Sequence, residues 1–238
     1  MSSTVPEGWM SERLGNHVKL ESGHAFKSSQ FTDTGVPLVR ISNIRNDKID
    51  LSDSVCFEEN SFFEKYVVEN GDILFAMSGA TTGKVGKYTY GFESYLNQRV
   101  GKFKVIDETK SENEFIYQLV RSTEFSETIL TDAIGGAQPN ISSFQVESIV
   151  LKFPPLPEQK KIASILTSVD EVIENTQKQI DKLQDLKKAT MNELLTKGIG
   201  HTEFKDSELG RIPKSWEVVT LNEVTVNHDS KRVPIKSV

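Results

Sequence analysis

The chain of 238 residues is long enough for one ordinary domain with additional elements, and its 37% hydrophobic and 26% charged residues exclude a disordered protein. It has no apolar run of the roughly 20 residues that span a bilayer, so no membrane partner is expected. Its single cysteine, Cys56, excludes an intrachain disulfide and a cysteine-based zinc site, which favours the cytoplasm. The net charge of −6 argues against a nucleic-acid partner, although the excess acid lies in residues 1–155 and the stretch Ser78–Lys104 is locally positive.

The first 155 residues combine short β-patterned runs with a helical stretch. Five runs are rich in β-branched and aromatic residues and are bounded mostly by Gly, Asn and Ser, which predicts strands. These runs are Val36–Ser42, Asp72–Ser78, Lys84–Tyr90, Arg99–Ile106 and Ser148–Phe153. Between Ser111 and Asp132, the spacing of apolar residues predicts one or two helices. We therefore expect an α+β domain with a mixed sheet over residues 1–155.

A long helix is predicted next, from Glu158 to Thr196. Prolines at 154, 155 and 157 end the last strand, and a proline fits the first turn of a helix. Apolar residues and one threonine then alternate at spacings of four and three, which is the heptad seam of a coiled coil. The seam consists of Ile162, Leu166, Val169, Ile173, Thr176, Ile180 and Leu183. At about 1.5 Å per residue this helix is about 58 Å long, so we expect the segment 156–198 to pair with another helix.

A partial internal repeat follows the long helix. Gly198 is a typical residue for ending it, and the polar stretch 199–211 is predicted to be a linker. The opening Val-Pro-Glu-Gly-Trp, with Trp9 five residues before Leu14, recurs as Ile-Pro-Lys-Ser-Trp, with Trp216 five residues before Leu221. We interpret residues 212–238 as the start of a second copy of the first domain.

Several segments, in this order along the chain, resemble the DNA-specificity subunits of bacterial type I restriction–modification systems. They are Val36–Ile44, Gly71–Gly86, Leu96–Val105, Gly135–Leu166, Ile212–Trp216 and Asp229–Lys236. The most specific is Gly135–Leu166, in which a Gln-Pro-Asn loop, a short helix and a strand precede Pro-Pro-Leu-Pro-Glu-Gln and the long helix. The resemblance covers essentially the whole chain.

The resemblance implies a recognition protein without chemistry of its own. A full subunit of this family has two target-recognition domains, each reading one half of a split double-stranded DNA target, and two antiparallel long helices act as a spacer between them. It recruits modification subunits, which transfer methyl groups from S-adenosylmethionine to adenine, and restriction subunits, which cut DNA. The present chain departs from this pattern because it lacks most of the second domain and the second long helix.

Polar residues around the predicted strands are the candidate DNA contacts. Arg suits guanine, and Asn or Gln suits adenine, whereas Ser, Thr and Lys suit the phosphate backbone. The candidates are Arg40, Asn43, Arg45, Ser78, Thr81, Thr82, Lys84, Asn97, Gln98, Arg99, Gln138 and Asn140. Most of them have a plainer interpretation: the glycines around Thr81 form a tight turn between strands, Asn97–Arg99 are structural polar residues at a strand start, and Gln138 and Asn140 cap the next helix.

Catalytic and metal-binding signatures are not found in the sequence. It has no Asn/Asp-Pro-Pro-Tyr signature of an adenine methyltransferase, its four histidines are scattered, and Asp72 lacks a nearby Glu-x-Lys partner. We therefore expect no catalytic residues, metal or cofactor on this chain. Any S-adenosylmethionine is expected on a modification subunit.

Two other functions and one assembly state remain to be weighed. The chain could be the recognition module of a fused restriction–methylation enzyme, or a coiled-coil assembly protein without DNA specificity. In either form the apolar stripe of the long helix needs a cover. We expect an antiparallel homodimer through Ile162, Leu166, Val169, Ile173, Ile180 and Leu183.

Overall fold

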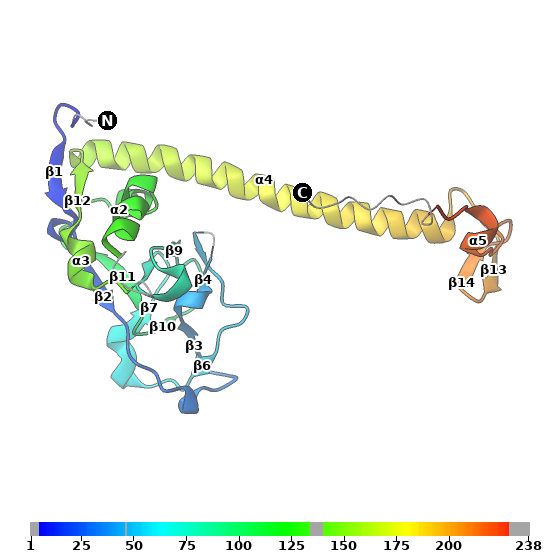
Figure 1. The fold of residues 1–238 in the computed structure, drawn as a ribbon, viewed down its shortest axis with the longest axis horizontal. Helices are drawn as coiled ribbons and strands as arrows, with labels where there is room; N and C mark the ends of the chain where they lie inside the picture. The colour runs from blue at the N-terminus through cyan, green and yellow to red at the C-terminus, as the bar shows by residue number, and fades with distance from the viewer. Residues whose placement is uncertain (1–4, 46, 134–139, 229–238) are drawn as a thin grey trace. The chain divides into compact units, whose positions relative to one another are not determined.

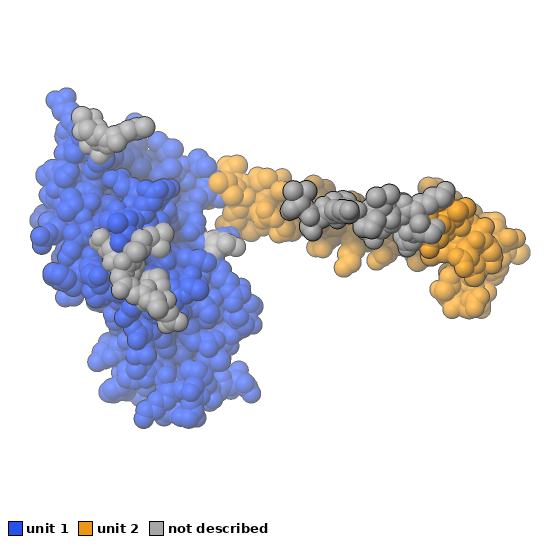
Figure 2. All heavy atoms as spheres, in the orientation of Figure 1, with its two compact units in different colours: residues 1–170 blue, residues 171–238 orange. Residues whose placement is uncertain are grey.

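The computed structural model describes residues 5–45, 47–133 and 140–228, and the chain divides into two compact units, residues 1–170 and 171–238 (Figure 2). The first unit contains two mixed sheets and three short helices (Figure 1). The expected α+β class, with a mixed-sheet domain before one long helix, is confirmed.

A six-stranded sheet forms the centre of the first unit. Its strand order is β2 (Val18–Ser22), β11 (Val100–Val105), β8 (Ile73–Ala76), β9 (Val85–Lys87), β5 (Lys48–Ile49) and β4 (Ile44–Arg45). Neighbouring strands are antiparallel except for β5 and β9, which are parallel. All four residues of β8 are buried, which explains why its sequence is a continuous apolar run rather than an alternating one.

The two faces of β8 belong to two different hydrophobic cores. Ile73 and Phe75 pack into a core with the helical residues Ile116, Phe125 and Val146. The alternate residues of the strand, Leu74 and Ala76, pack on the other side with residues of the second sheet. The helices concerned are α1 (Asn113–Val120), α2 (Thr123–Ala133) and α3 (Ser143–Ser148). The central sheet therefore has helices on one face and the second sheet on the other.

The second sheet has four strands, and two of them end directly before polar candidate residues. Its order is β6 (Cys56–Phe57), β3 (Val36–Val39), β10 (Ser94–Leu96) and β7 (Val67–Val68).

A separate antiparallel pair joins β1 (Met10–Arg13) to β12 (Val150–Phe153), so that the beginning and the end of the domain meet. Short 3-10 segments of the first unit include η1 (Leu14–Asn16), η3 (Ile41–Asn43), η4 (Ser61–Tyr66) and η5 (Gly79–Thr81).

The long helix α4 runs from Leu156 to Lys197 and so confirms the helix predicted from 158 to 196. Its 42 residues correspond to about 63 Å at about 1.5 Å per residue. Its first turns belong to the first unit, where Gln159 and Ala163 are buried. The helix ends at Gly198, whose φ of 66° lies in the left-handed region, and its backbone N–H donates to the carbonyl of Leu194.

The second unit continues with a β-hairpin and a short helix after α4. The hairpin joins β13 (Phe204–Ser207) to β14 (Gly210–Pro213), and the helix α5 spans Leu221–Val224. The internal repeat is visible in one turn of each copy: the backbone N–H of Trp9 donates to Pro6, and that of Trp216 donates to Pro213. Among the described helices, none combines the length and the apolar character that a bilayer crossing requires.

Candidate nucleic-acid interface

Three segments that are distant in sequence converge at the end of β8. The backbone N–H of Met77 donates to Arg99, and that of Ile141 donates to Met77, at 3.0 and 2.9 Å. Ser78 and Asn140 form an isolated antiparallel bridge beside them. The backbone therefore brings the predicted residues Ser78, Arg99 and Asn140 to one place.

The side chains at this point line a shallow hollow of about 380 Å³, which we call the Arg99 hollow. It is lined by Ser22, Met77, Gln98, Arg99, Asn140, Ile141, Ser142, Ser143 and Gln145. The Arg99 Nη1 donates to the Asn140 Oδ1 at 3.0 Å, which orients both side chains although both are exposed. The hollow thus presents guanidinium, amide and hydroxyl groups, the groups that bind base edges and phosphates.

The neighbouring Asn97 is held by backbone pairing on two sides. Its N–H donates to the carbonyl of Val39, and it forms a parallel bridge with His24. The N–H of His24 donates to Leu96 and the N–H of Gln98 donates to His24, both at 2.8 Å. This close pairing needs Gly23, because a Cβ there would lie 2.0 Å from the carbonyl oxygen of Leu96.

The segment from Ser78 to Lys84 forms the turn between β8 and β9, as its plainer interpretation predicted. Gly79 and Gly83 have φ values of 79° and 87°, which glycine adopts without strain. The hydroxyl of Thr82 donates to the carbonyl of Gly79, and that of Thr81 donates to Ile41. Both hydroxyls therefore stabilise the turn, and Lys84 is its exposed cationic residue.

The candidates Arg40, Asn43 and Arg45 lie beside carboxylates, unlike the residues of the Arg99 hollow. The side chain of Asn43 is fully buried, accepts from the N–H of Arg40 and donates to Asp50, so its position argues against a base contact. Arg45 forms ion pairs with Asp53 and Asp50 at 2.7 and 3.1 Å. The hydrogen bond that Arg45 donates to the Asp53 carboxylate raises the pKa of Arg45. These carboxylates reduce the attraction of the group for phosphate.

The remaining candidate, Gln138, lies outside the described residues. The polar lining residues that the sequence prediction missed are Ser22, Ser142, Ser143 and Gln145. Ser143 and Gln145 begin α3 directly after Asn140, where Ser142 and Gln145 form a capping box, and that Ser-x-x-Gln pattern could have marked them. Ser22 reaches the hollow only because β2 pairs with β11, which no local pattern indicates.

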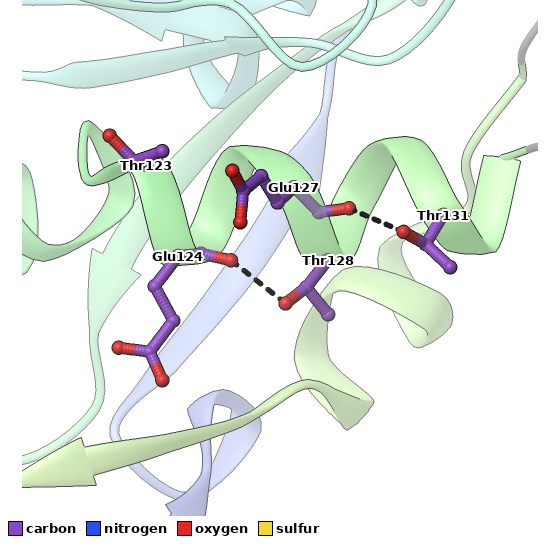
Figure 3. A pocket seen from close by; sticks show the side chains of 5 residues that line it. All are labelled: Thr123, Glu124, Glu127, Thr128 and Thr131. Atoms are coloured by element: carbon purple, nitrogen blue, oxygen red, sulfur yellow. Dashed lines mark hydrogen bonds between the residues drawn. The ribbon is translucent and has the colours of Figure 1, made fainter. Parts of the chain in front are cut away.

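The described part of the first unit has further hollows. One runs along the exposed side of α2 and is lined by Thr123, Glu124, Glu127, Thr128 and Thr131 (Figure 3). The hydroxyls of Thr128 and Thr131 donate to carbonyls of their own helix, so they are committed to it. In the part of the chain that the structure describes, no three His, Cys, Asp or Glu side chains gather as metal ligands would.

The chain is similar to known proteins over most of its length. The family model "Type I restriction modification DNA specificity domain" matches residues 6–185. The chain is 33% identical over 201 residues to the type I restriction enzyme MjaVIII specificity subunit of Methanocaldococcus jannaschii, which covers 81% of this chain and 46% of that protein. It is 32% identical over 225 residues to the putative MjaX specificity subunit of the same organism, covering 91% and 52%.

The fold is also similar to a solved one. The crystal structure of the type I restriction–modification system S subunit from M. genitalium matches with a TM-score of 0.58 at 18% identity, covering 82% of this chain and 47% of that one. The chain spans about half the length of the curated relatives it matches. The resemblance inferred from the motifs is confirmed, and the chain belongs to the type I restriction modification DNA specificity domain family.

Proposed function

We propose that this chain is the DNA-recognition part of a type I restriction–modification complex and reads one half of a bipartite target. The observation that supports this most is the convergence of Gln98, Arg99 and Asn140 at the Arg99 hollow, with Ser78 bridged to Asn140 beside it. Arg, Gln and Asn are the side chains that discriminate bases in the major groove. The relatives named as specificity subunits support the same assignment.

The proposed subunit performs no chemistry itself and depends on partners in the cytoplasm. Modification subunits would dock through α4 and carry S-adenosylmethionine, and restriction subunits would join through the complex. The proposed division of the chain is a recognition domain at 1–155, a spacer helix at 156–198, a linker at 199–211 and the start of a second recognition domain at 212–238.

The exposed apolar stripe of α4 supports a helix partner. Leu166, Val169, Ile173, Ile180 and Leu183 are 40%, 51%, 62%, 42% and 63% exposed. Ile162 differs, because it packs partly buried against the core of the first unit. The proposed pairing seam therefore begins at Leu166, and a second copy of the chain is its proposed cover in the absence of other subunits.

The proposed function is tested by selecting DNA from a random double-stranded pool with the chain assembled with its modification subunits. The wild type should enrich a defined sequence. The variant Lys84→Ala should bind all DNA more weakly without changing that sequence, because a phosphate contact carries no base information. The variant Arg99→Ala should lose discrimination by about 1–3 kcal/mol at one position of the sequence, as expected for a guanine contact.

The outcomes separate this proposal from its rivals. A coiled-coil assembly protein without specificity would enrich no sequence, and that result would overturn the proposal. A fused restriction–methylation enzyme would require a methyltransferase domain in the same polypeptide. If both variants retained wild-type affinity and discrimination, the Arg99 hollow and the β8–β9 turn would be ordinary surface.

A further inference from the structure

Arg121, which directly follows α1, joins two distant segments of the first unit. Its Nη2 lies 3.0 Å from the Asp47 Oδ2, in the turn between β4 and β5, and its Nη1 lies 2.7 Å from the Asp170 Oδ2, on α4. Gln118 donates to the same oxygen of Asp170 at 2.8 Å. The guanidinium also lies 4.8 Å from the ring centroid of Tyr117. We call these five residues the Arg121 clamp.

The clamp is partly shielded from water, so water weakens its ion pairs less than it weakens ion pairs on an open surface. The side chain of Arg121 is 20% exposed, and its Nε–H is buried with no acceptor among the described residues. Burial disfavours the charged guanidinium, but the hydrogen bonds to Asp170 and Asp47 outweigh it and raise its pKa. Only an arginine offers two forked donors to two carboxylates at once, so the residue type fits a bridging task.

The clamp also fastens the β4–β5 turn. The hydroxyl of Tyr117 donates to the carbonyl of Asp47 at 3.0 Å. Asp47 has a φ of 62°, in the left-handed region that Asp tolerates better than most residues. The turn, α1 and α4 are thus tied together at one point.

A second polar anchor holds the beginning of α4. Gln159 is 1% exposed. Its Oε1 accepts from the N–H of Glu112 at 3.0 Å, and its Nε2 donates to the carbonyls of Lys110 and Pro154, both at 2.9 Å. Eleven residues separate Gln159 from Asp170, which is about 16 Å along a helix. One anchor would leave the helix free to pivot, whereas two anchors at this distance hold the direction of its first turns, residues 156–170.

We propose that Arg121 is a positioning residue which, together with Gln159, fixes the direction of the first turns of α4, residues 156–170, on the first unit. The proposal rests on the function proposed above for its consequence: the direction of the spacer helix then decides which distance between two half-targets is accepted. The residues at the Arg99 hollow choose the sequence of a half-target, and Arg121 acts only on the spacing.

The test of the anchor itself needs no DNA. Spin labels are placed on the full chain at Lys19→Cys, in β2, and at Lys188→Cys, on α4, in a Cys56→Ser background, and labelled protein is diluted with unlabelled protein. Asp170→Ala removes the helix end of the clamp, and alanine favours the helix. Asp181→Ala is the matched control, because it removes the same type of side chain about three turns later, from a hydrogen bond with Gln177 within α4.

The expected result is one narrow distance distribution for the wild type and for Asp181→Ala, and a broader or shifted one for Asp170→Ala. A wild type that is already broad, or an Asp170→Ala variant as narrow as the wild type, would overturn the proposal.

The consequence for DNA is measured by the same selection from a random pool. Asp170→Ala should enrich the wild-type half-target sequence with a wider range of spacings between the two halves. An unchanged range of spacings would overturn the proposed role in spacing. If the wild type enriched no sequence, the function proposed above would fail, whereas the spin-label measurement would still decide whether the clamp fixes the helix.

Discussion

At the scale of single residues, His17 shows how burial couples the domain to pH. The side chain is 5% exposed and stacks on Phe153 with ring centroids 3.6 Å apart. Its Nε2 lies 3.0 Å from the Glu12 Oε2, and its Nδ1 lies 2.8 Å from the Ser111 Oγ. Burial lowers the pKa of His17, and the attraction of Glu12 only partly opposes this; Lys110 lowers it further.

A lowered pKa in the folded state means that protons favour the unfolded chain. The contribution of His17 to the free energy of unfolding is complete above the unfolded pKa of about 6.5 and is lost as the pH falls from there toward the folded pKa. We expect the wild type to lose more stability between pH 7 and pH 5 than His17→Gln does, by about 1.4 kcal/mol for each unit by which the pKa is lowered. Denaturant unfolding across this pH range measures the difference, and parallel profiles for the two proteins would contradict the expectation.

At the scale of elements, the contact between the end of β2 and the segment after β10 depends on the absence of a side chain. A Cβ on Gly23 would lie 2.0 Å from the oxygen of Leu96 and 2.5 Å from that of Asn97. Both are backbone atoms, so they cannot move aside as the end of a flexible side chain can. An alanine at position 23 would therefore push the end of β2 away from the segment after β10, which contains Asn97 and Gln98.

We expect Gly23→Ala to lower the free energy of unfolding by about 1–3 kcal/mol, as overpacking usually does. Gly91→Ala is the matched control, because no atom lies within 4 Å of its Cβ position. The denaturation midpoints of the two variants and the wild type provide the measurement. Equal midpoints for Gly23→Ala and the wild type would show that the segments can part without cost.

Elements with a strong local pattern could be predicted from the sequence, and elements made by pairing could not. The buried run of β8 and the apolar spacing of α4 were predicted because each pattern extends over several residues. Strands β4, β5, β6 and β7 have two residues each, and two residues show no period. Their partners in the sheets specify them, and apart from the pairing of β4 with β5 these partners lie far away in the sequence.

The same distinction applies to the candidate interface. Gln98, Arg99 and Asn140 were predicted because their chemistry suits DNA, and the structure brings them to one hollow. Asn43 has the same chemistry, but it is buried and bonded within its own loop. Burial depends on the packing of η3 below the turn of η5, which the composition of a short segment does not reveal.

At the scale of the whole molecule, the exposed stripe of α4 is wider than one pairing seam. Ile165, Val172 and Leu186 are 56%, 64% and 61% exposed and lie beside the seam that begins at Leu166. A strict two-stranded coiled coil buries only the narrow seam. The additional apolar residues support a second contact along the same helix, which suits the proposed docking of a modification subunit next to a paired helix.

The last prediction concerns assembly of the chain by itself. The stripe from Ile165 to Leu195 contains about ten large aliphatic side chains, and at about 1 kcal/mol for each partly buried one, covering them is worth on the order of 10 kcal/mol. A two-fold axis lets the same stripe cover itself, so we expect an antiparallel dimer. Sedimentation should give a dimer at micromolar concentration, and Leu166→Glu combined with Ile180→Glu should give a monomer, since each glutamate would be buried without a partner.

The control is Ser164→Glu combined with Lys178→Glu, which lies away from the seam and should remain dimeric. A monomeric wild type, or a dimer that survives the two seam glutamates, would show that α4 is not covered by a second copy and that its stripe serves another subunit alone.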